Sequence, residues 1–345
     1  MATPIYEFAQ LPQVSGKASV RAHPRRQRVA GEAPRVGVIY NPRSHGNQGA
    51  DFDCGISPHV HIAQPGDRSQ LPEALADFAA RDIDLLVING GDGTVRDVLT
   101  CGAPIFGDDW PALAVLPKGK TNALTVDLGV PKDWTLQSAI DAFEAGRRVH
   151  RRPIAIGQKD VDASSRVLGF ILGAGAFTTA TRAGQSAHRL GAFNSMAVGV
   201  TTLWVVLQFL FASRNNPWRR GARMAIGLGT QEAPMAHSGV GDPDWRQFLL
   251  ATTLETLPAG LRPFGHLRKG LKLVALDQVS RGTMFSVLPV MKGKTRPKLR
   301  ERGVHQISTP QFTLDIDDQF IFDGEAFPAG EYCIEQGPEL EFVTA

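Results

Sequence analysis

The sequence predicts an α/β fold in two parts: a parallel sheet covered by helices on both faces, followed by a mostly antiparallel β domain. The chain has 345 residues, which is long enough for two domains. Between residues 35 and 150, apolar strands alternate with helical segments, as in a parallel sheet with crossover helices. After about residue 150 the strands follow one another mostly without helices, which favours antiparallel pairing.

The first 33 residues show little periodicity, so we expect a flexible tail there. Four arginines (Arg21, Arg25, Arg26 and Arg28) lie among Pro, Ala and Gly in this stretch, and a weak anchor for anionic lipid is the alternative interpretation. The predicted domains are then residues 34–150 for the α/β part and residues 151–345 for the β-rich part.

The α/β part is expected to begin with the strand Val36–Tyr40, which ends at Asn41. A helix is predicted over residues 70–81, with Ser69 as its N-cap. Residues 84–88 form an apolar run that indicates a buried parallel strand leading into Gly90.

Residues 95–99 have a helix-compatible composition, and residues 113–116 predict a further strand that runs into Pro117. A second helix is expected near residues 134–145, where apolar side chains recur at helical spacing and Gly146 marks the end. The strand ends at Asn41, Gly90 and Pro117 should then meet at one edge of the sheet, where ligands bind in such folds.

In the β-rich part, six apolar segments predict strands: residues 154–156, 167–172, 271–276, 284–290, 312–316 and 320–322. Residues 194–212 are the exception, because they form a long apolar run of helical length.

The turn Gly90-Gly91-Asp92-Gly93-Thr94 is the most informative part of the chain, since it joins a buried strand to a helix. Glycines let backbone N–H groups approach an oxyanion closely, and the helix N-terminus adds partial positive charge. Asp92 would repel a bare anion, but it suits a site where a divalent cation lies between its carboxylate and a polyphosphate. The turn therefore predicts a nucleotide and metal site.

Composition excludes several other classes of protein. The net charge is only +3, from 37 Lys+Arg and 34 Asp+Glu, which excludes a polyanion binder driven by bulk charge but not one driven by a local patch. No nucleic acid partner is expected. Cys54, Cys101 and Cys333 lack metal-binding spacing and suit free thiols in a reducing cytoplasm. Residues 1–10 lack the pattern of a signal peptide, and a cytoplasmic location is expected.

Four motifs in one order resemble the diacylglycerol kinase-like lipid kinases, a group that includes bacterial lipid kinases and sphingosine kinases. They are Asn41-Pro42-Arg43-Ser44, Gly90-Gly91-Asp92-Gly93-Thr94, Leu116-Pro117-Lys118-Gly119-Lys120-Thr121-Asn122 and Asp323-Gly324-Glu325. NAD kinases and phosphofructokinases have similar glycine-rich turns, whereas the late Asp-Gly-Glu favours the lipid branch. The resemblance implies a Rossmann-like nucleotide-binding domain of the NAD kinase and diacylglycerol kinase type, then a β-rich domain, with ATP and a lipid head group between them.

The resemblance also implies roles for individual residues. The nucleotide-binding residues would be Asn41, Pro42, Ser44, Gly90, Gly91, Asp92, Gly93, Thr94, Lys118, Gly119, Lys120, Thr121 and Asn122. Asp92 would position Mg²⁺-bound ATP, directly or through water. Asp323 is the expected base for the acceptor hydroxyl, and Glu325 would position the acceptor or a metal. The alternative assignment makes Asp92 the base and Asp323 a supporting group.

The chain departs from the family pattern at several positions. Lys120 stands where the family has Thr, and Ala123 where it has Asp. Arg96 and Asp97 replace Asn and Glu after the glycine-rich turn, and His45 interrupts what is often Ser-Gly. The change at residue 123 bears on a substrate contact.

Two segments bear on membrane contact. Residues 196–212 suit a buried helix beside the lipid site or, alternatively, peripheral membrane contact through Trp204, Phe209 and Phe211. Lys292, Lys294, Arg296, Lys298, Arg300 and Arg302 alternate with other residues. If that segment is extended, the six cations share one face that could rest on anionic lipid.

The predicted function is ATP-dependent phosphorylation of a lipid hydroxyl, diacylglycerol-like or sphingoid-like, by in-line phosphoryl transfer. One alternative is a soluble kinase of a non-lipid acceptor on the same scaffold. The other is a catalytically weakened nucleotide-binding regulator, which the residues at positions 120 and 123 motivate. Peripheral contact with the inner membrane face remains open.

Overall fold

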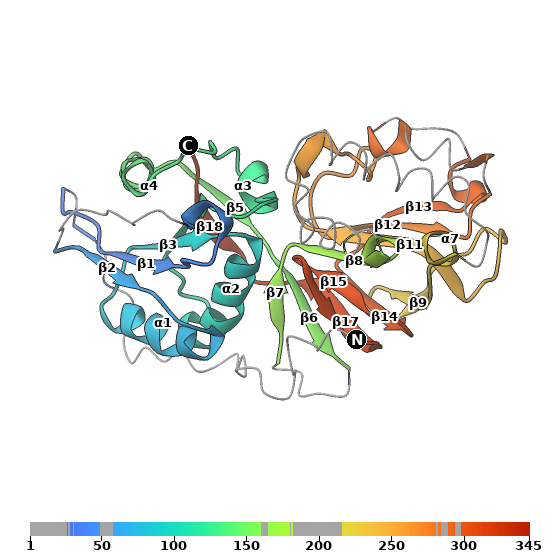
Figure 1. Ribbon diagram of the computed structural model, residues 1–345, viewed down its shortest axis with the longest axis horizontal. Helices are drawn as coiled ribbons and strands as arrows, with labels where there is room; N and C mark the ends of the chain where they lie inside the picture. The colour runs from blue at the N-terminus through green and yellow to red at the C-terminus, as the bar shows by residue number, and fades with distance from the viewer. Residues whose placement is uncertain are drawn as a thin grey trace.

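A computed structural model of the chain describes residues 26, 28–29, 31–48, 58–159, 165–179, 181, 216–280, 282–283, 289–293 and 298–345. It confirms the predicted α/β class, with a mostly parallel sheet in one part of the molecule and an antiparallel sheet in the other. The two parts lie side by side, and α2 of the first part faces β7 of the second (Figure 1).

The first sheet has six strands in the order β2-β1-β3-β4-β18-β5. Their bounds are β1 (Val36–Tyr40), β2 (Val60–Ala63), β3 (Leu85–Gly90), β4 (Ala112–Pro117), β5 (Arg148–Arg151) and β18 (Leu340–Val343). All neighbouring strands pair in parallel except β5, which is antiparallel to β18. The strand β18 comes from the end of the chain, so the last residues complete the first sheet.

Helices cover both faces of this sheet (Figure 1). They are α1 (Leu71–Ala80), α2 (Asp92–Phe106), α3 (Ala123–Asp127) and α4 (Leu136–Glu144), with short 3₁₀ turns η2 (His45–Asn47) and η3 (Arg68–Gln70). The helices α1 and α2 pack on each other, and α4 contacts β3, β4 and β18. Because both faces are covered, residues 85–88 of β3 have no exposed surface.

The start of α1 differs from the prediction. The helix begins at Leu71 with proline in its first turn, and Gln70 occupies the N-cap position without a side-chain hydrogen bond. Ser69 instead lies in η3, where its backbone N–H donates to the Asp67 carboxylate at 2.8 Å. The prediction of Ser69 as the N-cap was therefore wrong.

The second sheet has twelve strands, and all their pairings are antiparallel. They are β6 (Ile154–Gln158), β7 (Val167–Gly169), β8 (Ile171–Gly175), β9 (Ala222–Leu228), β10 (Ala233–Pro234), β11 (Trp245–Thr252), β12 (Lys272–Asp277), β13 (Val304–Ser308), β14 (Gln311–Ile316), β15 (Phe320–Phe322), β16 (Glu325–Phe327) and β17 (Gly330–Gln336). Short helical turns are α7 (Pro217–Arg220), η4 (Pro258–Gly260) and η5 (Arg300–Arg302).

Two expectations for the second part need correction. The strand expected over residues 167–172 is two strands, because the ladder breaks at Phe170 between β7 and β8. The strand expected over residues 284–290 is wrong at residues 289–290, which are helical, while 284–288 lie outside the described residues. For the alternating cations the sequence leaves both conformations open, and the described ones are not extended, since Lys292 lies in a turn and Arg300 and Arg302 in η5.

The apolar run at 194–212 lies outside the described residues, as do Lys294 and Arg296. Within the described part of the chain, no helix combines the length and apolar character needed to cross a bilayer.

The chain crosses between the two parts at β5–β6 and again at β17–β18. The two crossovers are joined, since the Gly337 N–H donates to the Pro153 carbonyl at 2.8 Å. Farther along the interface, the Leu168 N–H of β7 donates to the Thr100 hydroxyl of α2 at 3.0 Å. The second contact holds the middle of α2 against β7 of the second sheet.

Candidate functional site

The ends of β1, β3 and β4 lie together at one edge of the first sheet, as the sequence predicted. Tyr40 is in register with Asn89, and Gly90 with Pro117. The loops that carry the first three motifs therefore start from adjacent strands.

Hydrogen bonds between side chains hold the first two loops together. The Asn41 amide donates to the Thr94 hydroxyl at 2.8 Å. The buried Asn47 amide donates to the Asn41 carbonyl and to the Asn89 side chain, each at 2.8 Å. Sequence reasoning missed Asn47 and Asn89, although their buried amides order the loop behind Asn41.

Glycine is required where the second and third loops touch. A Cβ atom on Gly91 would lie 2.8 Å from the Gly119 Cα, and a Cβ on Gly119 would lie 2.6 Å from the Gly91 Cα. Gly91 is the N-cap of α2 and makes no side-chain cap. The backbone donors in the first turn of this 15-residue helix therefore point toward the space between the loops.

The third loop is closed on itself by Asn122, which has left-handed backbone angles (φ 51°, ψ 48°). Its side chain accepts from the Gly119 N–H at 2.7 Å and donates to the Gly119 carbonyl at 2.8 Å. The Lys118 N–H donates to the Gly90 carbonyl at 3.2 Å, and its carbonyl accepts from the Gly46 N–H at 2.9 Å. Lys118 thus joins all three loops through its backbone.

Asp92 links the starts of two helices. It is the first residue of α2, and its carboxylate accepts from the N–H groups of Ala123 at 3.1 Å and Leu124 at 3.4 Å, at the start of α3. Burial raises the pKa of Asp92 above its ordinary value, and these backbone donors oppose that rise. Ala123, which stands where the family has Asp, therefore contacts Asp92 through its backbone N–H and not through its side chain.

Asp323 comes from the other part of the molecule, directly after β15, and has a left-handed φ of 45°. Its carboxylate accepts from the N–H groups of Phe170 and Ile171, both at 2.9 Å, where the ladder breaks between β7 and β8. Gly169 leaves the room for this contact, because a Cβ there would lie 2.2 Å from the Asp323 carboxylate.

The pKa of Asp323 is raised to about 7. Burial is the main cause and the nearby Asp92 carboxylate adds to it, while Arg96 and the two backbone donors oppose it. A carboxyl group with this pKa can both accept and release a proton near neutral pH.

Behind Asp323 lies a cluster of two arginines and two carboxylates, which we call the α2 charge cluster: Arg68, Arg96, Asp97 and Glu325. Arg96 contacts Glu325 at 2.6 Å and Asp97 at 3.0 Å. Arg68 contacts Asp97 at 3.3 Å and Glu325 at 3.4 Å. Sequence reasoning noted Arg96 and Asp97 only as departures from a pattern, and it missed Arg68, which lies in a 3₁₀ turn without a motif.

These groups surround a cleft of about 810 Å³ between the two sheets. Among the predicted site residues, those that line it are Asn41, Ser44, Gly91, Asp92, Gly93, Thr94, Gly119, Lys120, Thr121, Asp323 and Glu325. Pro42, Gly90, Lys118 and Asn122 do not line it. Ile171, Phe177 and Ile321 add an apolar wall on the side of the second sheet.

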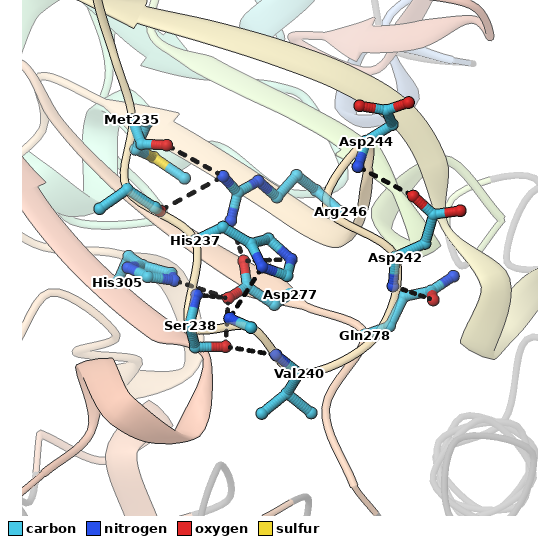
Figure 2. A network of polar contacts seen from close by, with 12 residues as sticks. Met235, His237, Ser238, Val240, Asp242, Asp244, Arg246, Asp277, Gln278 and His305 are labelled. Atoms are coloured by element: carbon cyan, nitrogen blue, oxygen red, sulfur yellow. Dashed lines mark hydrogen bonds and ion pairs between the residues drawn. The ribbon is translucent and has the colours of Figure 1, made fainter.

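A second polar cluster, far from these motifs in the sequence, surrounds the buried Asp277 carboxylate of β12 (Figure 2). It accepts from the Ser238 hydroxyl at 2.6 Å and the His305 Nε2–H at 2.9 Å, and it pairs with Arg246. Burial and Arg246 lower the pKa of His305 to about 4, so this histidine is neutral at pH 7. Ser238 and His305 each contact the carboxylate, so the cluster lacks the serine-to-histidine contact of a hydrolytic triad and anchors a loop instead.

The residues that form one side of the cleft are similar to those of a known protein family. Residues 35–158 match the model of the diacylglycerol kinase catalytic domain. Over 85 residues the chain is 38% identical to the diacylglycerol kinase of Bacillus subtilis, and over 89 residues it is 34% identical to the lipid kinase YegS of Escherichia coli K12. These alignments cover 25% of this chain and 26% and 29% of the two relatives, so the chain matches only about a quarter of their length.

Solved structures extend the likeness of the fold to most of the chain. A crystal structure of a diacylglycerol kinase from Bacillus anthracis covers 90% of this chain and 97% of its own, with a TM-score of 0.54 at 14% identity. A further structure from that organism, with the same coverage, has a TM-score of 0.60 at 15% identity. The resemblance indicated by the four motifs is confirmed by the match of residues 35–158 to the diacylglycerol kinase catalytic domain model and by the similarity to curated lipid kinases.

Proposed function

We propose that this protein is an ATP-dependent lipid kinase that phosphorylates a hydroxyl group of a diacylglycerol-like or sphingoid-like acceptor. The observation that carries the proposal is the shared cleft, in which three strand-end loops of the first sheet face Asp323 of the second. The match of residues 35–158 to a diacylglycerol kinase catalytic domain supports it.

The loops at the carboxyl edge of the first sheet would bind the ATP phosphates. The first turn of α2 offers backbone N–H donors, and the contact between Gly91 and Gly119 brings two backbones close to the same space. Thr94 and Lys120 line the cleft beside these donors and would add a hydroxyl and a positive charge. Phosphoryl transfer depends mostly on such positioning and charge neutralisation.

The residues present fit a bound Mg²⁺ ion. Asp92 and Asp323 both line the cleft, and the charge of Asp92 raises the pKa of Asp323, so a bound cation would relieve the repulsion between these two carboxylates. The Asp92 carboxylate keeps free lone pairs beside its two backbone donors, and Mg²⁺ is usually held by one or two carboxylates and substrate phosphates. When bound, the ion would neutralise charge on the phosphate oxygens.

Asp323 is the group we assign to the acceptor. Its carboxylate is fixed by two backbone N–H groups and has a pKa of about 7, so it can take the proton of an acceptor hydroxyl near neutral pH. The apolar wall of Ile171, Phe177 and Ile321 would lie along the hydrocarbon part of the acceptor. The attacking oxygen would then approach the terminal phosphate in line with the leaving group.

A phosphate-transfer screen tests this function. The purified protein is incubated with Mg²⁺, labelled ATP and either a detergent-dispersed total lipid extract or a water-soluble metabolite extract, with the Asp323→Asn variant as the matched control. We expect label in the lipid fraction for the wild type alone. Label only in water-soluble acceptors would favour the soluble-kinase alternative, and ATP binding without any transfer would favour a regulator.

A further inference from the structure

Arg96 is the largest side chain in the described structure with no exposed surface. It belongs to the first turns of α2 in the nucleotide-binding part, yet its guanidinium reaches the Asp-Gly-Glu turn of the second sheet. Its Nη1 lies 3.2 Å from the Phe322 carbonyl and 3.5 Å from the Asp323 carbonyl, and its Nη2 lies 2.6 Å from the Glu325 carboxylate. One side chain thus contacts three residues of a turn from the other part of the molecule.

Glu325 is correspondingly surrounded by cations. Its carboxylate contacts Arg96 at 2.6 Å and Arg68 at 3.4 Å. The other carboxylate of the cluster, Asp97, accepts from the Nε and Nη2 of Arg96 at 3.2 and 3.0 Å, which fixes the plane of the guanidinium. A buried arginine is tolerated only with such pairing, and removal of one partner leaves an uncompensated charge.

The position of Asp323 depends on this turn. Its backbone has a left-handed φ of 45°, and Gly324 follows with a φ of 83°. These two residues lie between the anchored Phe322 carbonyl and the anchored Glu325 side chain. A displacement of about 1 Å at a reacting group can cost on the order of 100-fold in rate.

We propose that Arg96 is a positioning residue that holds the Asp-Gly-Glu turn against α2, and that Glu325 serves as its counter-ion and takes no part in the chemistry. The effect on turnover rests on the proposed kinase function, whereas the effect on the turn does not. The assignment changes the role expected for Glu325 from the sequence.

Kinetics test the proposal. Arg96→Met should lower kcat by about 100-fold, while the KM for ATP changes less than about 3-fold, because the nucleotide loops do not depend on Arg96. Arg96→Lys should retain part of the activity, since an ammonium group can pair with Glu325 but cannot form the planar fork to Asp97. A loss in which kcat and ATP affinity fall together would overturn the positioning role.

The double variant Arg96→Met, Glu325→Gln separates the two roles of Glu325. If Glu325 is only the counter-ion, the double variant should lose no more activity than Arg96→Met alone. Losses that multiply would show that Glu325 acts independently on the reaction. The double variant also removes both charges, so it should fold even if Arg96→Met alone does not.

Hydrogen exchange tests the turn without any turnover. Amide exchange of residues 320–327 should speed up at least 10-fold in Arg96→Met and less in Arg96→Lys. Arg81→Met is the matched control, because Arg81 forms an exposed ion pair with Asp77 on α1 at 2.7 Å. Unchanged exchange in Arg96→Met would reject the proposal even if lipid kinase activity is found, and faster exchange would support it even if none is found.

Discussion

At the scale of single residues, Gly91 gives a direct test of the proposed phosphate binding by the loops after β3 and β4. A Cβ added there would lie 2.8 Å from the Gly119 Cα, which is backbone and cannot swing away. Gly91→Ala should therefore push the second and third loops apart and weaken ATP binding at least 10-fold, measured by calorimetry. Gly282→Ala is the control, because Gly282 does not line the cleft and its Cβ would meet nothing closer than the Ser280 hydroxyl oxygen at 3.9 Å. Equal losses in both variants would contradict this account.

Asp323 gives a second test at this scale. Asp323→Asn should lower turnover by at least 100-fold and change ATP affinity little, since in the proposed function the group takes the proton of the acceptor. In the wild type, kcat/KM should rise with pH and level off above about 7, the pKa of the buried carboxyl. A flat pH profile, or an equal loss of ATP affinity, would point to a metal or nucleotide role instead.

The raised pKa of Asp323 should also make the stability of the protein depend on pH. Its ordinary pKa is 3.8, and the folded protein raises it to about 7, so between these values the folded state holds a proton that the unfolded state has released. Wild-type stability should therefore fall relative to Asp323→Asn as pH rises from about 4 to 7, by up to a few kcal/mol. Urea unfolding of both proteins at several pH values measures this difference, and a constant difference would contradict the raised pKa.

The residues of the candidate site show how much of it could be predicted from the sequence. Most motif residues line the cleft. They could be predicted because the glycine-rich turn and the strand ends have distinctive local sequence patterns. The partners of Arg96 could not be predicted, since Glu325 lies more than two hundred positions away and no periodicity links it to α2. The wrong prediction of Ser69 as the N-cap has a local cause, because Asp67, two residues earlier, accepts the Ser69 N–H and holds Ser69 in η3.

At the scale of elements, the Asp277 cluster ties three strands to one loop. Asp277 lies on β12, Arg246 on β11 and His305 on β13, while Ser238 belongs to the loop before β11 (Figure 2). Asp277→Ala should destabilise the protein by about 3–5 kcal/mol, because Arg246 would remain buried without its counter-charge. Thermal unfolding measures the loss, and Asp244→Ala, which removes an exposed partner of Arg223, is the control. Similar stability in both variants would show that the pairing contributes little.

Some strands could be predicted from their hydrophobic pattern, and one break between strands could not. The run before Gly90 and the strands β1, β4 and β15 agree with the prediction, because continuous apolar runs need burial on both faces. The strand β14 also agrees, because its apolar residues alternate and lie on one buried face. The break at Phe170 was not predicted, since it depends on Asp323 accepting the N–H groups of residues 170 and 171. The hydropathy of residues 167–172 cannot predict a strand break that is caused by a carboxylate distant in the sequence.

At the scale of the whole molecule, the strand β18 joins the end of the chain to the first sheet. It lies between β4 and β5, and Leu340, Phe342 and Val343 are almost completely buried. Residues 34–150 were predicted as one domain, and that stretch lacks this strand. A fragment of that length would expose the β4 edge and lose the partner of β5.

The last prediction follows from this closure of the sheet. Phe342→Ala should destabilise the protein by about 3–5 kcal/mol, because it removes a buried aromatic side chain from the core of the first part. Because the variant keeps every residue that lines the cleft, ATP should recover part of the loss, since a ligand that binds only the folded state stabilises it. Urea unfolding with and without ATP measures both effects, with Val126→Ala as an exposed apolar control. If ATP stabilised Phe342→Ala no better than buffer while it still stabilised the wild type, the variant's cleft would be disrupted, which would show that the last strand supports the binding site as well as the fold.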